Sequence, residues 1–265
     1  MKSMREKWLF FDIDGTIVTA DHHIPESAKV ALFRARELGH HLIVNTGRPY
    51  LHVEPQIKAL PFNGYICSLG GYIRFRDEKL RHIRFSAEES REIRDLALSC
   101  GMYTFYESEK NACCDTSNTS PIALQECEWM RKIGVPLVTD LYRDDFSFDK
   151  FVCWPGPNAE TERFCAALSD KLDFIHRENR MQEAVRKGYT KGTGVRFFCD
   201  MLNISRVNTV SFGDGPNDID MLRETGTGVL LGNAPEEIWH EATFVSAPIW
   251  EDGLSKAMEQ LGLLD

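Results

Sequence analysis

The sequence lacks the features that mark membrane-spanning, secreted and nucleic-acid-binding proteins. No apolar run approaches the roughly 20 residues that cross a bilayer. The N-terminal stretch MKSMREKWLFFD has only a short apolar segment before an acidic residue, so it is not a secretory signal. The net charge is −9, and no basic stripe compensates for it. We therefore expect neither a membrane nor a nucleic-acid partner.

Regular cysteine spacing and a GxxxxGK[ST] phosphate-binding loop are also missing. The eight cysteines form no CxxC pair, so they do not predict a zinc site, and most lie in apolar stretches as small core residues. Reduced cysteines without an export signal favour a cytoplasmic location. The absence of the loop means that a nucleotide-hydrolysing motor of that type is not supported.

What the sequence does have is material for a large core, because 43% of its 265 residues are hydrophobic and 27% are charged. Both ends of the chain alternate between strand-like and helix-like segments. We predict strands at 7–12, 41–45, 64–68, 207–212 and 228–231, and helices at 25–38, after Pro49, and at 191–202, 216–225, 235–241 and 253–261. Strand–helix–strand order predicts a parallel sheet that is covered on both faces.

The middle of the chain has a different order of predicted strands and helices. We predict a hairpin at 72–76 and 80–85, helices at 87–100, 121–131 and 158–168, and strands at 103–106, 111–114, 137–141, 147–153, 172–175 and 181–186. This α+β pattern indicates a second domain at 80–187, inserted into a core formed by 1–79 and 188–265. The predicted fold class is α/β: a doubly wound, Rossmann-like parallel-sheet core with an inserted α+β domain.

Polar residues stand where the predicted core strands end or a helix begins. In open α/β sheets the ligand site lies at the carboxyl ends of the strands. Four such places carry polar motifs: Asp12-x-Asp14-Gly15-Thr16, Asn45-Thr46-Gly47-Arg48, Lys191-Gly192, and Gly213-Asp214-Gly215-Pro216-Asn217-Asp218. A carboxylate at the end of a buried strand is costly unless something pairs with it.

This combination of residue types suits the transfer of a phosphoryl group. Carboxylate oxygens suit Mg²⁺, which keeps some of its waters and shares phosphate oxygens with a substrate. Thr46, Lys191 and the backbone N–H groups that the glycines leave accessible are suited to bind the phosphate itself. A carboxylate that lies beside both the Mg²⁺ and the phosphate can attack phosphorus and form an aspartyl phosphate.

The four motifs, in this order, resemble the haloacid dehalogenase superfamily. The stretches GDGPNDIDML and LGNA, and an insertion after the third strand, are similar to the Cof-type phosphatases with an α/β cap (type IIB). The resemblance covers essentially the whole chain. It implies a Mg²⁺-dependent phosphatase that acts on small phosphorylated metabolites, most often sugar phosphates. We expect a monomer or a homodimer.

The resemblance also implies a role for each matched residue. Asp12 would be the nucleophile, and Asp14 would protonate the leaving oxygen and then deprotonate the attacking water. The side chains of Asp12 and Asp214, with the backbone carbonyl of Asp14, would hold Mg²⁺. The remaining expected roles are phosphoryl binding by Thr46 and Lys191, phosphate or substrate binding by Gly47, Arg48 and Asn217, and orientation of the metal or Lys191 by Asp218.

Several alternatives remain open from the sequence. A phosphomutase of the same architecture would use the same catalytic residues, and a binding protein on this scaffold would bind ligand without turnover. Arg48 could reach the substrate or could equally pair with a nearby acid. At Gly70 the Cof-type pattern usually has Asn, so substrate contacts carried over at this position are in doubt.

Overall fold

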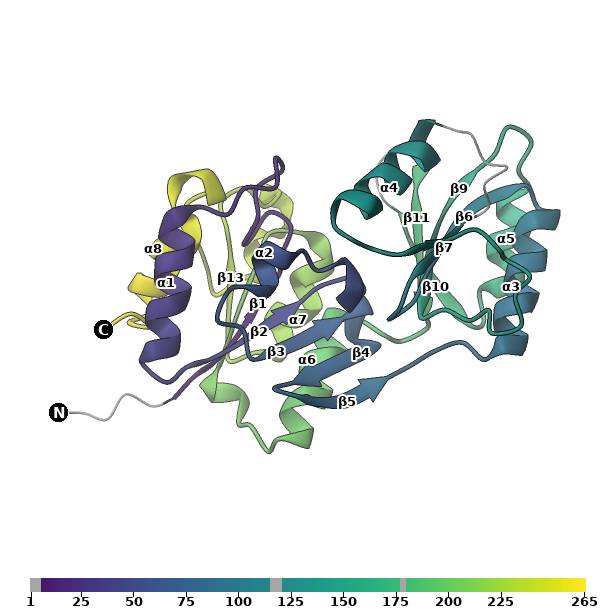
Figure 1. Ribbon diagram of the computed structural model, residues 1–265. Helices are drawn as coiled ribbons and strands as arrows, with labels where there is room; N and C mark the ends of the chain where they lie inside the picture. Colours follow the sequence, from purple (N-terminus) through teal and green to yellow (C-terminus); the bar gives the residue numbers. More distant parts are fainter. Residues whose placement is uncertain (1–5, 115–120, 177–179) are drawn as a thin grey trace. The chain divides into compact units, whose positions relative to one another are not determined.

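The computed structural model describes residues 6–114, 121–176 and 180–265 (Figure 1). It divides into two compact units. The first unit combines the chain up to Gly47 with 56–81 and 190–265, and the second combines 48–55 with 82–189. The predicted boundaries lay at 80 and 187. In the structure the units divide after Arg81 and after Tyr189, and residues 48–55, which were expected in the core, group with the second unit.

The first unit is built on an eight-stranded sheet in the order β14-β13-β12-β1-β2-β3-β4-β5. The strands from β14 to β3 are parallel, and β4 returns antiparallel to β3. The bounds are β1 Trp8–Phe11, β2 His41–Asn45, β3 Gly64–Cys67, β4 Tyr72–Phe75, β5 Glu78–His82, β12 Thr209–Gly213, β13 Thr227–Leu230 and β14 Phe244–Val245. The predicted α/β core with a parallel sheet is confirmed.

Helices cover both faces of this sheet, which explains why its central strands are continuous apolar runs. Figure 1 shows α1 and α8 on one side and α6 and α7 on the other. Phe10 of β1 faces α6, where its ring meets Phe198 edge-on, whereas the next residue, Phe11, stacks on Phe212 of β12. The helices are α1 Glu26–Glu37, α2 Pro55–Lys58, α6 Lys191–Met201, α7 Ile219–Glu224 and α8 Gly253–Gln260.

The second unit contains a six-stranded sheet in the order β10-β11-β9-β6-β7-β8, in which only β7 and β8 pair in parallel. Its elements are α3 Ala87–Ser99, β6 Met102–Glu107, β7 Ala112–Cys114, α4 Pro121–Lys132, β8 Leu137–Val138, β9 Lys150–Pro155, α5 Thr161–Leu168, β10 Leu172–His176 and β11 Gln182–Arg186. Aromatic residues dominate its core, including Tyr106, Phe148 and Phe151. Within the described residues, no helix has the length and apolar content needed to cross a membrane.

The sequence misjudged several short elements. The predicted helix 235–241 is a 3-10 helix, Glu236–Glu241, and the predicted helix 216–225 opens as a 3-10 turn, Pro216–Asp218. Strand β14 was missed because it has only two residues, too few for an alternating pattern. The predicted strand 137–141 shrinks to β8, Leu137–Val138, which pairs with Ala112 and Cys113 of β7.

Close packing requires glycine at position 70. Its φ is +89°, and a Cβ there would lie 2.9 Å from Cα of Gly194 on α6. A Cβ on Gly194 would in turn lie 2.6 Å from Cγ2 of Ile66. A residue with any side chain at position 70 would therefore push α6 away from the sheet.

The second unit also buries a network of charges. Lys150 pairs with Glu183 and lies 3.4 Å from Glu107, whose other oxygen is 3.3 Å from Nδ1 of His52. All four residues are buried. Burial alone would raise the pKa of Glu107, but Lys150 and His52 outweigh it and lower that pKa to about 2.

We predict that Gly70→Ala destabilises the protein more than Gly39→Ala does. Gly39 has a comparable φ of +92° but nothing within 4 Å of its missing Cβ, so its substitution reports backbone strain alone, about 1–2 kcal/mol. The clash at Gly70 should add about 1–3 kcal/mol. Urea unfolding followed by circular dichroism measures both variants. Equal losses of unfolding free energy would contradict the packing explanation.

We predict that Glu107→Gln lowers the free energy of unfolding by about 2–4 kcal/mol at pH 7, because it leaves Lys150 without one of its carboxylates. The folded-state pKa of Glu107 is lowered to about 2, so its stabilisation is present above the usual glutamate pKa and is lost as the pH falls from about 4.5 toward 2. Denaturant titrations at several pH values should show that the difference in unfolding free energy between this variant and the wild type shrinks as the pH falls over that range. Glu92→Gln, at an exposed ion pair, is the matched control and should show little effect.

Candidate active site

The site is assembled where β1 and its neighbours end. Because β1 pairs in parallel with both β12 and β2, the residues after these three strands meet at one edge of the sheet. Asp12 follows β1 directly, is buried, and donates its backbone N–H to the carbonyl of Phe212 at 3.0 Å. Asp14 lies two residues further along, and its side chain is exposed.

Lys191 is the centre of the site. It is the first residue of α6, whose start is fixed by a reciprocal capping box between Thr190 and Thr193. Its fully buried Nζ lies 2.6 Å from Oδ1 of Asp12 and donates to Oδ1 of Asp218 at 2.6 Å. Burial alone would lower the pKa of Lys191, but the two carboxylates outweigh it and raise that pKa, so the group stays an ammonium ion.

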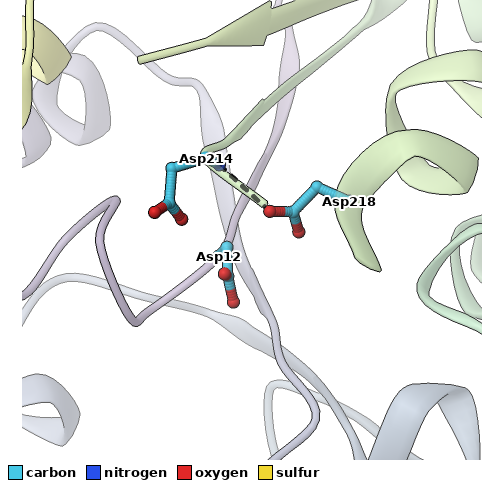
Figure 2. A group of neighbouring side chains, drawn as sticks. All are labelled: Asp12, Asp214 and Asp218. Atoms are coloured by element: carbon cyan, nitrogen blue, oxygen red, sulfur yellow. Dashed lines mark hydrogen bonds between the residues drawn. The ribbon is translucent and has the colours of Figure 1, made fainter. Parts of the chain in front are cut away.

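Asp218 holds both the lysine and the turn that carries Asp214. While Oδ1 accepts from Lys191, Oδ2 accepts from the backbone N–H groups of Asp214 and Gly215, each at 3.0 Å. Figure 2 shows the carboxylate aimed back at the backbone of Asp214. Asp218 thus contacts both the lysine and the turn that carries Asp214.

Asp214 is held by Thr16 of the first motif and by Asn233, which lies outside the four motifs. Thr16 donates its hydroxyl to Oδ1 of Asp214 at 3.2 Å, and Asn233 donates its side-chain amide to Oδ2 at 3.0 Å. Asn233 also donates to the carbonyl of Gly15 at 2.9 Å and accepts from the backbone of Ile249. The signal was available, since Asn233 follows the predicted strand 228–231 as another polar residue after a strand end.

The turn after β1 packs directly against Asp214. Gly15 has a φ of +78°, and a Cβ on it would fall 1.9 Å from Oδ2 of Asp214. Glycine is therefore required twice over, for the backbone conformation and for the approach of the carboxylate.

The cluster carries more negative than positive charge. Figure 2 shows the side chains of Asp12, Asp214 and Asp218 gathered in one place. One carboxylate oxygen of each lies within 4.8 Å of the others, and Lys191 pairs with Asp12 and Asp218. Burial, and then the nearby Asp218, raise the pKa of Asp214 to about 7. Burial and the same neighbour also raise the pKa of Asp12 well above its usual value.

A divalent cation fits this donor set. The oxygens are hard ligands, they converge, and the surplus negative charge needs a positive partner. Asp218 is the least available of the three, because it is fully buried and its oxygens accept from Lys191 and from two backbone N–H groups.

Two other predicted residues, Thr46 and Asn217, lie in the segments that follow β2 and β12. Thr46 is buried after β2, and the preceding Asn45 donates its side-chain amide to the carbonyl of Lys191 at 3.1 Å, which ties β2 to α6. Asn217 is half-buried in the turn before Asp218. Arg48, the residue after Gly47, groups with the second unit and pairs with the buried Glu54 at 3.2 Å. Pairing with a nearby acid was one of the two roles that the sequence allowed for Arg48.

Fold and site together define an α/β protein with a carboxylate–lysine site at the carboxyl edge of a parallel sheet. The family model of the haloacid dehalogenase-like hydrolases matches residues 9–258. The chain therefore belongs to this family, as its motifs predicted.

Relatives named as phosphatases match nearly the whole chain. YkrA of Bacillus subtilis (strain 168), a protein named as a phosphatase, is 28% identical over 261 residues, covering 98% of this chain and 100% of that one. An HMP-PP phosphatase of Serratia proteamaculans (strain 568) is 24% identical over 244 residues, 84% of this chain and 83% of that one. The solved structure of the HAD subclass IIB sugar phosphatase BT4131 matches with a TM-score of 0.80 and 28% identity, covering 97% of this chain and 99% of that one.

We predict that Asp214→Asn stabilises the protein at pH 8 in the presence of a chelator. The folded-state pKa of Asp214 is raised to about 7, so ionising it opposes folding; this penalty grows as the pH rises from about 4 to 7 and is complete above that. Removing it should add about 1–3 kcal/mol to the free energy of unfolding, allowing for partial exposure. Thermal unfolding at pH 5 and pH 8 measures the effect.

Added Mg²⁺ should make the wild-type protein more stable than Asp214→Asn. It should raise the melting temperature of the wild-type protein at pH 8 and leave Asp214→Asn nearly unchanged, because binding to the folded state alone is stabilising. Asp200→Asn, at an exposed position on α6, is the matched control and should follow the wild type. If Asp214→Asn were less stable than the wild type in chelator at pH 8, the inferred excess of negative charge would be wrong.

Proposed function

We propose that the protein is a Mg²⁺-dependent phosphatase that hydrolyses phosphate monoesters of small metabolites, with sugar phosphates as the first choice. The observation that carries the proposal is the buried Lys191, which bridges Asp12 and Asp218 while Asp214 lies beside them. A fixed ammonium next to an acidic nucleophile and a cation site is the arrangement that phosphoryl transfer requires.

The first step is attack by Asp12 on phosphorus. Its carboxylate oxygen forms a bond to phosphorus while the ester P–O bond breaks, and the leaving oxygen takes a proton from Asp14. The exposed side chain of Asp14 can exchange protons with water, as an acid–base group must. Lys191 keeps Asp12 oriented and offsets the charge on the phosphoryl oxygens.

The second step is hydrolysis of the aspartyl phosphate. Asp14 takes a proton from water, the water oxygen attacks phosphorus, and the bond between phosphorus and Asp12 breaks to release inorganic phosphate. Thr46, at the adjacent strand end, would bind the phosphoryl group, and Gly47, Arg48 and Asn217 would contact phosphate or substrate.

Mg²⁺ would be held by the side chains of Asp12 and Asp214 and the carbonyl of Asp14, and it would supply the positive charge that keeps Asp12 ionised. The raised pKa of Asp12 supports this need, since burial and neighbouring carboxylates favour its protonated form. Asp218 would act indirectly by holding Lys191 and the turn.

The choice of sugar phosphates is supported by one solved neighbour that is a sugar phosphatase. Another relative is named for a different substrate, HMP-PP. We propose a small phosphorylated metabolite as the substrate, with no nucleic-acid or membrane partner, and a cytoplasmic monomer or homodimer. A phosphomutase of the same architecture is the main alternative.

We predict that phosphate is released from p-nitrophenyl phosphate and from members of a sugar-phosphate panel with Mg²⁺, but not with EDTA. Asp12→Asn should lower kcat/KM at least about a thousand-fold, because it removes the nucleophile. Asp200→Asn is the matched control and should keep wild-type activity, since that residue is exposed on α6. A colorimetric phosphate assay measures all three proteins.

Full activity of Asp12→Asn would refute the assigned nucleophile. Release that is unaffected by EDTA would refute the role of Mg²⁺. If a sugar monophosphate were isomerised only in the presence of a sugar bisphosphate, without net phosphate release, the mutase alternative would replace the proposal.

A further inference from the structure

Asn233 joins separate segments of the first unit at the carboxylate–lysine site. It lies half-buried in the loop after β13. Its side-chain amide donates to the carbonyl of Gly15 at 2.9 Å and to Oδ2 of Asp214 at 3.0 Å, and its side-chain oxygen accepts the backbone N–H of Ile249 at 2.9 Å. Asn233 therefore connects the turn after β1, the end of β12 and the segment before α8.

These partners fix which way the amide points and which residue can fill the position. A carbonyl and a carboxylate accept hydrogen bonds, and a backbone N–H donates, so Nδ2 of Asn233 faces Gly15 and Asp214 while Oδ1 faces Ile249. An ionised aspartate at position 233 would have no donor, and a serine would have one. A short side chain that donates twice and accepts once is asparagine.

A second bridge reaches the other oxygen of Asp214. Thr16, which is fully buried in the turn after β1, donates its hydroxyl to Oδ1 at 3.2 Å. The turn after β1 is thus joined to Asp214 directly through Thr16 and indirectly through Asn233, which holds the carbonyl of Gly15. We call Thr16 and Asn233 the Asp214 clamp.

The Asp214 clamp orients its carboxylate without neutralising it. The hydroxyl and the amide are uncharged donors, whereas Asp12 and Asp218 pair with the ammonium of Lys191. The two oxygens of a carboxylate offer about four lone-pair positions, so each oxygen of Asp214 can still bind a cation. Hydrogen bonds to these oxygens favour the ionised carboxylate, which is the form that binds a metal ion.

The Asp214 clamp also fixes two groups relative to each other that would hold Mg²⁺. The carbonyl of Asp14 belongs to the turn that Thr16 and Asn233 tie down, and the side chain of Asp214 is the group to which they tie it. Mg²⁺ demands near-ideal octahedral geometry, so its affinity falls when its ligands can move apart.

We propose that Asn233 and Thr16 are positioning residues that set the Mg²⁺ affinity of the site, because they hold Asp214 at a fixed place relative to the turn that carries Asp14. The inference rests on the proposed function for the identity of the cation. It concerns the binding of Mg²⁺ rather than turnover. Removal of a side chain that orients a metal ligand typically weakens metal binding about 10–100-fold.

The test is isothermal titration of the chelator-stripped full chain with MgCl₂. Asn233→Ala should bind Mg²⁺ about ten-fold more weakly than the wild type, or weaker still, because Asp214 loses a hydrogen bond and the turn after β1 loses a tie. The Mg²⁺ concentration that gives half-maximal phosphate release should rise by the same factor. A wild-type protein that binds Mg²⁺ but releases no phosphate would refute the proposed function, and the titrations would still decide this inference.

Asn63→Ala is the matched control for a purely structural role. The amide of Asn63 is engaged at both ends, since Oδ1 accepts from the backbone of Leu42 at 3.0 Å and Nδ2 lies 2.9 Å from Nδ1 of His41. Asn63 precedes β3, so it lies at the opposite end of the parallel strands from the site. This variant should lose unfolding free energy in urea but bind Mg²⁺ like the wild type.

If Asn233→Ala does not fold, as judged by circular dichroism, Thr16→Val carries the test, because it removes the other donor of the clamp and nearly keeps the shape of the side chain. It should also bind Mg²⁺ more weakly than the wild type. The proposal is overturned if the wild-type protein does not bind Mg²⁺, or if a folded clamp variant binds it as tightly as the wild type. It is equally overturned if Asn63→Ala weakens Mg²⁺ binding as much as the clamp variant does.

Discussion

The placement of Lys191 is the constraint on which the site depends. Its ammonium is fully buried between Asp12 and Asp218, and each of these carboxylates ends or follows a different element of the first unit. A buried charge is tolerated only when it is paired, so the lysine fixes β1, α6 and the turn after β12 relative to one another. The same pairing sets up the chemistry, because it leaves a surplus of carboxylates for a cation to neutralise.

Close packing at glycines makes this placement possible. α6 can bring Lys191 to the sheet edge because Gly70 and Gly194 let the helix approach the chain after β3. Gly15 likewise lets the turn after β1 approach Asp214. These contacts use residues without side chains, so their function is visible only as distances in the folded structure.

The motifs of the candidate site could be located in the sequence because each is a local pattern. An apolar strand followed by carboxylates, as at Asp12, can be read without knowing the partner strands. Order along the chain then indicated the family. The sequence assigned no role to Thr16, although it stands in the first motif, or to Asn233, because their hydrogen bonds to Asp214 span about 200 and 19 residues of chain. Short elements such as β14 were not predicted, because two residues are too few to show a periodic pattern.

Periodicity and the polar residues at strand ends are local features, so the strand–helix order, the parallel core and the residues that follow its strands could be predicted from the sequence. The carboxylates that pair with Lys191 and the packing that requires glycine at position 70 became visible only in the folded structure. Those facts depend on distances between segments far apart in the chain, and such distances follow from packing of the whole domain rather than from any single stretch.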